Sequence, residues 1–343
     1  MKNAAPISYY APGPSLKAKT LAPSDFSLLS ELEEDARQPL AALAKKLKIS
    51  QQLLFYRLQS LRKKNIVAGY FTRINFTAFG YTRYRVMVRL SNYSPQKAAE
   101  IITALKVHPN VQWLVECGGR WDLIINFMAK NIIQLEGFLK ELKGRFPRQM
   151  QNLDVLTTIE VIELGRSYFT GGTKEVKNLS YFGRDYDGVK IDRINLLILS
   201  FISENARRSS VEIAEKLGVS PNTVSMRIKN LKARGIIRGF KPLIHLENLG
   251  YGTYKTAIKF QNHTERRERE IIDFLRKNIQ VVAIIRLIGQ WDFEIEFEVD
   301  SRRDVIELTR NFRDKFKDVI KEFEIIPLYH EYRYNFFPGD LLS

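Results

Sequence analysis

The chain contains two copies of one sequence, separated by an offset of 170 residues. Shifting the chain by that amount superposes its halves without a gap, and 17 of the 61 positions from 25 to 85 then carry identical residues. Much further along, Gly119-x-Trp121-Asp122 falls on Gly289-x-Trp291-Asp292. Because each supersecondary unit must then occur twice, we expect two copies of one architecture in the folded chain.

The bulk composition is that of a globular protein without a membrane span. The 343 residues suffice for two or three domains, 45% of them are hydrophobic, and no apolar run is long enough to cross a bilayer. The single cysteine, Cys117, excludes a disulfide framework and favours a reducing compartment. Residues 1–24 lack an apolar signal segment and are predicted to form a flexible tail. We expect a cytoplasmic protein without membrane partners.

Positive charge is concentrated in the first part of each copy. The net charge of the chain is +16. Residues 25–85 hold 11 lysines and arginines against 5 aspartates and glutamates, and residues 191–255 hold the same numbers. The remaining parts of the copies are close to neutral. This localisation favours double-stranded DNA as the partner, since phosphate contacts require clustered cations.

The second copy predicts a helix-turn-helix (HTH) unit. A helical apolar stripe runs through residues 194–202, and a second helix follows Ser209 or Ser210. Gly218 ends the second helix, and Ser220-Pro221 opens a third as N-cap and first residue. Residues 235–240 then predict a short strand suited to a wing. Two helices joined by a short turn containing glycine form the DNA-binding HTH arrangement.

The polar face of the third helix is the candidate DNA-reading surface. Its side chains lie off the buried stripe of Val224, Ile228 and Leu231, and they combine base-edge hydrogen-bonding groups with phosphate-binding cations. An ordinary solvated helix face is the alternative interpretation. The candidates are Ser220, Asn222, Thr223, Ser225, Met226, Arg227, Lys229 and Asn230, with Arg238 in the wing.

The sequence resembles the Lrp/AsnC (feast/famine) family of transcription regulators. The resemblance rests on Ile191-Asp192-x-x-Asn195, on Asn205-Ala206-Arg207, on Ile213-Ala214-x-x-Leu217-Gly218-Val219-Ser220 and on Val224-x-x-Arg227-Ile228-x-x-Leu231 followed by Gly235-Ile236-Ile237-x-Gly239. It implies that residues 220–230 form the DNA-reading helix. It also implies a following α/β unit that pairs through its open sheet face and, in many members, binds an amino acid or related effector.

The first copy departs from this pattern. Lys48 replaces the turn glycine, Gln51 replaces Pro221, and Asn65 stands where Gly235 is expected. Its third helix is more apolar, so it either reads DNA or packs against the other copy, and its last turn carries candidate phosphate contacts. The candidates here are Gln51, Gln52, Tyr56, Arg57, Arg62, Lys63 and Lys64.

After each wing the pattern predicts a ferredoxin-like βαββαβ unit. In the second copy the expected elements are 252–260, 266–277, 281–288, 292–299, 303–317 and 321–333. The fold class is therefore α+β, a tandem duplication of a winged HTH domain followed by a ferredoxin-like (RAM-type) domain. The predicted divisions are winged helices at 25–80 and 191–250, ferredoxin-like sensor domains at 81–165 and 251–343, and a linker at 166–190.

The turns that carry the Gly-x-Trp-Asp motif match the family's effector site. The resemblance places a small effector near these turns, whereas the residue types alone also suit a well-formed hairpin that needs no ligand. The candidate effector residues are Gly119, Arg120, Trp121, Asp122, Gly289, Gln290, Trp291 and Asp292.

The open sheet faces of the two copies are complementary in charge. The second copy presents Glu294, Glu296 and Glu298 beside Lys255 and Lys259. The first copy presents Ile124, Asn126 and Met128 beside Arg85, Met87 and Arg89. We therefore expect an intramolecular pseudo-dimer, with further homo-oligomers left open.

An enzyme of the same layout is the alternative class. The four histidines do not cluster at metal-ligand spacing, no phosphate-binding glycine motif occurs, and no cofactor is expected. Sirohaem decarboxylases resemble Lrp/AsnC proteins but carry a histidine at the second strand of the α/β unit. Residues 111–114 and 281–284 hold none. A DNA-binding architectural protein of low sequence preference is a third interpretation.

Overall fold

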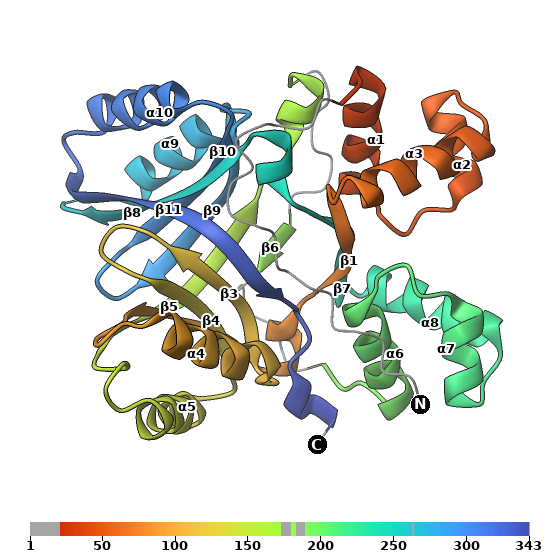
Figure 1. Cartoon of the computed structure of the whole chain (residues 1–343), viewed down its shortest axis with the longest axis horizontal. Coiled ribbons are helices and arrows are strands. Elements are labelled where there is room, and N and C mark those ends of the chain that lie inside the picture. The colour runs from red at the N-terminus through yellow and green to blue at the C-terminus, as the bar shows by residue number, and fades with distance from the viewer. Residues whose placement is uncertain (1–20, 173–179, 183–188, 263, 343) are drawn as a thin grey trace.

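The computed structural model describes residues 21–172, 180–182, 189–262 and 264–342, with only the backbone of 180–182. Most of the predicted tail and much of the predicted linker lie outside the described residues. Each copy begins with three helices, which confirms the HTH prediction (Figure 1). They are α1 (Pro23–Glu34), α2 (Leu40–Leu47) and α3 (Gln51–Lys63) in the first copy, and α6 (Arg193–Glu204), α7 (Ser210–Leu217) and α8 (Pro221–Ala233) in the second.

The turn between the second and third helices has the same geometry in both copies. Gly218 ends α7 in the left-handed conformation with φ +66°, and Lys48 ends α2 with φ +54°. Ser50 and Ser220 then cap α3 and α8, and their hydroxyls accept hydrogen bonds of 3.1 and 3.0 Å from the amides of Leu53 and Thr223. The first copy therefore keeps the turn without its glycine, at the cost of a strained lysine backbone.

The strand after each HTH unit pairs with its counterpart in the other copy. β1 (Val67–Ile74) and β7 (Ile237–Ile244) form an antiparallel two-stranded sheet with Thr72 opposite Phe240. Helix α1 packs on β7 and helix α6 packs on β1, so each HTH unit is completed by the other copy's strand. The predicted strand at 235–240 is present, but it does not fold back as a hairpin wing of its own.

The eight long strands of the two α/β units close into one ring. Their order is β2-β4-β3-β11-β8-β10-β9-β5, and β5 returns to β2. The short strand β6 (Ser180–Phe182) adds to β5. The bounds are β2 Thr82–Arg89, β3 Val111–Cys117, β4 Leu123–Ala129, β5 Asn152–Glu163, β8 Gly252–Phe260, β9 Val281–Ile288, β10 Phe293–Val299 and β11 Ile320–Tyr334. Because β3 pairs with β11 and β5 with β9, the predicted pseudo-dimer is confirmed.

The helices cover the outside of this barrel. Helices α4 (Pro95–Val107) and α5 (Ile132–Arg145) bury Ile101, Leu105 and Phe138 against the first sheet. Helices α9 (Glu265–Arg276) and α10 (Arg302–Lys315) pack on Phe293, Ile295 and Phe297 of the second, as the strand alternation predicts. Short 3-10 segments complete the chain at Phe76–Phe79, Ser167–Thr170, Leu246–Leu249 and Gly339–Leu342.

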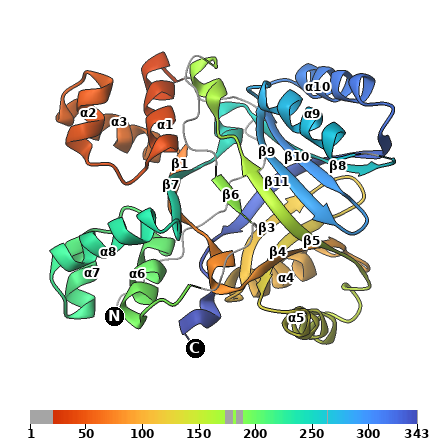
Figure 2. The ribbon, with the colours of Figure 1, turned by 180° about the vertical axis from the view of Figure 1, so that it is seen from behind.

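The two HTH units lie on one side of the molecule and the barrel on the other. Figure 2 shows the same separation from behind, with β1 and β7 between the two groups of helices. The open faces of the two sheets, which the sequence predicts to be complementary, face the inside of the barrel. Arg85 of β2 and Glu294 of β10 form an ion pair there, and both side chains are almost completely buried.

Candidate nucleic-acid interface

Helix α8 presents a polar face to solvent. Val224, Ile228 and Leu231 are buried, which fixes the orientation of the opposite face. The side chain of Met226 is 63% exposed, so this face is free of packing at its centre. The exposed candidates are Ser220, Asn222, Ser225, Met226, Lys229 and Asn230, while Thr223, Arg227 and Arg238 are partly buried.

Ser225 and Arg227 of α8 form hydrogen bonds with residues outside the helix. The Ser225 hydroxyl lies 3.0 Å from the Ser210 hydroxyl at the start of α7. The Arg227 guanidinium donates to the carboxylate of Asp192, at 2.6 Å, and this hydrogen bond lowers the pKa of Asp192. Arg227 therefore ties α8 to the first residue of the unit and acts on the position of the helix.

The same tie exists in the first copy with a different acid. Arg57 lies 170 residues before Arg227 and pairs with Asp25 at 3.1 Å. Asp25 sits in the first turn of α1, whereas Asp192 is the N-cap of α6, so the two acids do not align in the repeat. The arrangement was retained by placing an acid one helical turn further along.

Helix α3 presents a more apolar outward face than α8. Leu53, Phe55 and Tyr56 are 42%, 50% and 61% exposed, and Gln51 and Gln52 lie beside them at the helix start. This face is not packed against the other copy in the described residues, which removes one of the two alternatives for α3.

The basic residues at the end of α3 are partly accessible. Lys63 and Arg62 are exposed, and the Arg62 guanidinium lies 5.6 Å from the ring centre of Tyr70. Lys64 is the C-cap of α3 and is partly buried. The three side chains give the end of α3 a local positive charge.

The Gly-x-Trp-Asp turns are tightly built hairpins. The carboxylate of Asp122 accepts from the amide of Leu90 at 2.7 Å, and that of Asp292 accepts from Phe260 at 2.8 Å. Trp121 and Trp291 are buried, with exposed fractions of 5% and 3%. Gly119 and Gly289 adopt positive φ, so both turns need glycine.

The two turns approach each other. The Gln290 amide lies between Asp154 and the Arg120 guanidinium, at 2.7 and 2.9 Å. Residues 120 and 290 are equivalent in the repeat, so the contact lies near the axis that relates the two copies. The candidate effector residues of both copies are therefore brought together by the pseudo-dimer.

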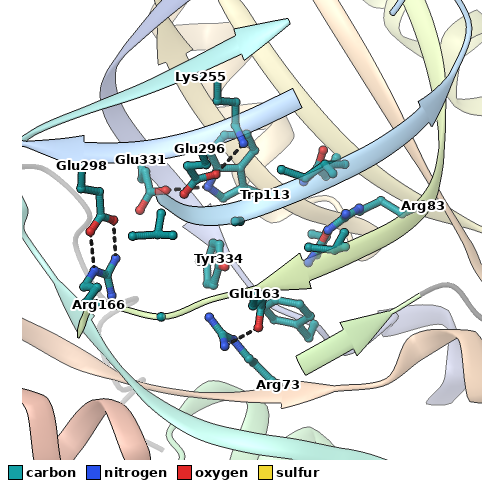
Figure 3. A pocket seen from close by; sticks show the side chains of 18 of the residues that line it. Arg73, Arg83, Trp113, Glu163, Arg166, Lys255, Glu296, Glu298, Glu331 and Tyr334 are labelled. Carbon is teal, nitrogen blue, oxygen red and sulfur yellow. Dashed lines mark hydrogen bonds and ion pairs between the residues drawn. The ribbon is translucent and has the colours of Figure 1, made fainter. Parts of the chain in front are cut away.

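The inside of the barrel is lined by ionisable side chains (Figure 3). Burial raises the pKa of Glu296, but its pairing with Lys255 and the nearby charges of Arg85 and Arg166 together outweigh burial, so the net pKa is lowered. Burial lowers the pKa of Lys255 to about 8 and that of Arg85 to about 9. Charges this deeply buried persist only where partners compensate their desolvation.

The junction between the barrel and the first HTH unit is ionic. Arg166 pairs with Glu298 through two hydrogen bonds of 2.8 and 2.9 Å and with Glu33 of α1. The equivalent of Arg166 in the second copy is Phe336, which stacks on Phe71 with ring centres 6.0 Å apart. At equivalent positions of the repeat, one junction is therefore held by ion pairs and the other by aromatic packing.

Sequence reasoning missed most of the barrel lining. Of the lining residues, it identified Arg85, Asn126, Lys255, Glu296 and Glu298 from their alternation, but not the side chains that approach from distant segments. The missed residues are Glu33, Arg73, Arg83, Glu163, Arg166, Glu331 and Tyr334. Charge at a strand position was an available signal for Arg73, Arg83, Glu163 and Glu331.

The described ranges contain no group of three or more His, Cys, Asp and Glu residues that could hold a metal ion. None of their helices combines the length and the apolar character that crossing a membrane requires.

Comparisons with known proteins agree with this architecture. The family described as winged helix-turn-helix DNA-binding matches residues 21–68 and 191–238, one match in each copy. A helix-turn-helix-type transcriptional regulator of Pyrococcus furiosus is 34% identical over 118 residues, which are 34% of this chain and 78% of that protein. The glutamate uptake regulatory protein of Zymomonas mobilis is 26% identical over 144 residues, 41% of this chain and 88% of that protein.

A solved structure matches the whole fused arrangement. The siroheme decarboxylase NirDL superposes with a TM-score of 0.59 and 14% identity over 91% of this chain and 93% of that one. The superposition shows that the two proteins share a fold, but at 14% identity it shows nothing about the chemistry of this chain. The regulators, in contrast, match in sequence across most of their own length. The chain belongs to the Lrp/AsnC family of helix-turn-helix transcription regulators.

Proposed function

We propose that the chain reads specific DNA sequences through α8, with α3 as a second, weaker contact. The observation that carries this proposal is the outward face of α8, where Asn222 and Asn230 offer amide groups beside Lys229. Amides of this kind pair with adenine edges, and lysine binds phosphate. A regulator of this kind acts where chromosomal DNA is, in the cytoplasm.

Helix α3 contributes in a different way under this proposal. Its exposed Phe55 and Tyr56 suit contacts with thymine methyl groups or sugars, and Arg62 and Lys63 suit phosphates. Since one chain already carries two HTH units on one side of the molecule, it presents two unequal half-site readers. We expect an operator whose two halves differ.

The repeat supplies matched variants for the test. Asn222 and Gln52 occupy equivalent positions, so Asn222→Ala and Gln52→Ala remove an amide from α8 and from α3. DNA bound by the full chain is first selected from a random library, and affinities are then measured by fluorescence anisotropy at fixed salt. Asn222→Ala should cost about 1–3 kcal/mol on the selected site and leave non-specific binding unchanged.

Two outcomes would contradict the assignment. Equal affinity of the wild-type chain for all DNA would favour an architectural protein. A larger loss for Gln52→Ala than for Asn222→Ala would make α3 the main reader. Lys229→Ala serves as the phosphate control, because it should weaken binding to every sequence by the same factor.

A small effector such as an amino acid is proposed to modulate this binding at the paired turns around Arg120 and Gln290. Further homo-oligomers belong to the same proposal, and light scattering with and without amino acids tests both. Substituting Gln290 should remove any response that depends on the turns.

We propose that the chain is not an enzyme, although it shares a fold with a decarboxylase. Residues 111–114 of β3 and 281–284 of β9 hold no histidine, which supports the proposal. Purified protein without haem-like absorption would agree with it, whereas a bound tetrapyrrole that loses carbon dioxide on incubation would overturn it.

A further inference from the structure

The barrel encloses a cavity whose charged lining is only partly paired. The cavity measures about 80 Å³ and lies among side chains of β2, β3, β5, β10 and β11. A second cavity of about 740 Å³ adjoins it between β7 and β11, and six residues line both. The smaller space, here called the inner cavity, therefore lies directly beside the larger one.

Most of the charges around the inner cavity form pairs. Figure 3 shows Arg166 against Glu298, Lys255 against Glu296 and Arg73 against Glu163. These pairs lie on different walls, so each charge is neutralised where it stands. Glu33 also pairs with Arg166, and Arg85 pairs with Glu294. Two charged side chains of the lining are then left without an ion pair among the described residues.

The first is Arg83 of β2. Its side chain is 7% exposed, and it forms no ion pair with any residue that the structure describes. Its Nε donates to the hydroxyl of Thr158 at 3.3 Å, and its Nη2 is buried without a hydrogen-bond partner. Burial lowers the pKa of Arg83 to about 10, so it stays charged at neutral pH. A buried guanidinium in this state lacks an anion.

The second is Glu331 of β11. Its carboxylate accepts a hydrogen bond from Trp113 Nε1 at 2.8 Å, but no cation pairs with it within the described ranges. Glu296 and Glu298 lie beside it and form ion pairs with Lys255 and Arg166, respectively. This wall therefore holds three carboxylates and two cations, and it lacks one positive charge.

We propose that the inner cavity binds a small zwitterion, whose carboxylate pairs with Arg83 and whose ammonium pairs with Glu331. The two groups line the same cavity on walls that Figure 3 shows apart, with Tyr334 between them. A space of about 80 Å³ accommodates roughly six heavy atoms, the size of a short amino acid. The separation of Arg83 and Glu331 selects the chain length between ammonium and carboxylate.

This site is distinct from the Gly-x-Trp-Asp turns, and it deepens the proposed function by naming a second place for an effector. It rests on the proposed function only in calling the ligand an effector. Arg73 of β1 and Glu33 of α1 also line the cavity, so bound charge would lie beside the segments that join the HTH units to the barrel. The binding test itself requires no DNA.

Calorimetric titration of the full chain tests the proposal. The probes are glycine, β-alanine and γ-aminobutyrate, which separate the same two charges by increasing lengths. Acetate and ethylammonium each carry one of the charges and should bind at least about tenfold more weakly than the best zwitterion. Arg83→Met and Glu331→Gln should each weaken that zwitterion about tenfold or more, and Arg83→Lys by less.

The control is Arg120→Met, which changes the turn site and leaves the cavity intact. Unchanged binding in this variant, with loss in the cavity variants, supports the inner cavity. Loss in Arg120→Met alone, or no binding of any zwitterion at millimolar concentration, overturns the inference. DNA affinity of the ligand-free chain is measured separately, so failure here leaves the test of α8 unaffected. Melting curves confirm that each variant folds.

Discussion

The Arg227 guanidinium, on the helix proposed to read DNA, lies 2.6 Å from the carboxylate of Asp192 at the start of the same unit. Asp192 also caps α6, since its carboxylate accepts from the amide of Asn195 at 2.7 Å. One carboxylate thus begins the first helix and orients the third. Arg227 is a positioning residue under this arrangement.

A double-mutant cycle tests this role. Arg227→Ala and Asp192→Asn should each weaken binding to the selected DNA, and the double variant should lose little more than either alone. We expect a coupling of about 0.5–1 kcal/mol, because the pair is half-exposed and water screens it in part. Asp192→Asn keeps the cap, which isolates the ion pair. Additive losses would mean that Arg227 contacts DNA directly, and Lys229→Ala with Asp192→Asn is the uncoupled control.

Lys48 should be replaceable by glycine with a gain in stability. In the folded chain, a φ of +54° costs lysine about 1–2 kcal/mol relative to glycine. Glycine offsets about 0.4–1 kcal/mol of this gain, because it makes the unfolded chain more flexible. Lys48→Gly should therefore stabilise the first HTH unit by at most about 1.6 kcal/mol, and Gly218→Lys should destabilise the second. Hydrogen exchange of amides in α2 and α7 measures both. Faster exchange in α2 of Lys48→Gly would contradict the account.

Glu331 should make the stability of the chain depend on pH. Burial raises its pKa from 4.5 to about 7, with a smaller contribution from Glu296. Between pH 4.5 and about 7, Glu331 is protonated in the folded chain and ionised in the unfolded chain. Its contribution to the free energy of unfolding therefore falls as the pH rises through this range. At pH 8 the full cost is about 3 kcal/mol. Glu331→Gln should therefore melt higher than wild type at pH 8 and nearly equally at pH 4.5.

The added zwitterion supplies the check on that interpretation. Because it would place an ammonium against Glu331, it should reduce the difference between wild type and Glu331→Gln at pH 8. A constant difference across the pH range would mean that Glu331 does not titrate as described.

Substitutions at the two junctions, Arg166→Ala and Phe336→Ala, should destabilise the chain with different pH dependence. Arg166→Ala leaves Glu298 buried without its cation and Glu33 with Lys241 alone, and Phe336→Ala leaves a cavity beside Phe71. Each substitution should lower the free energy of unfolding by about 3–5 kcal/mol at pH 8. At pH 5 the loss in Arg166→Ala should shrink, since protonation neutralises the two glutamates, whereas the loss in Phe336→Ala should not. Equal pH dependence in the two variants would contradict the ionic description.

Local signals predicted much of the fold. Alternation along Phe293–Val299 and the spacing of apolar residues in 303–317 set element bounds that differ from the observed ones by one or two residues. The opposite charges of Arg85 and Glu294 predicted the pairing of the two sheets. Turn geometry was harder, because Lys48 shows that a positive φ can persist without glycine.

The pairing partner of each strand between the two copies could not be predicted from the sequence. The strand at 237–244 has the same alternation whether it pairs within its copy or with residues 67–74, so the exchange between copies left no local trace. The same holds for Arg166 and Glu33, which are 133 residues apart and meet because α1 packs on the segment Ser167–Thr170. The inner cavity depends on such distant meetings, and none of its unpaired groups was singled out.

The ring of strands also determines which proteins this chain can combine with. The edges of β3 and β9 that a separate subunit could pair with are occupied by β11 and β5 of the same chain. The two halves therefore always meet in a one-to-one ratio. Their covalent link also allows each half to differ from the other, as α3 and α8 do, without losing its partner.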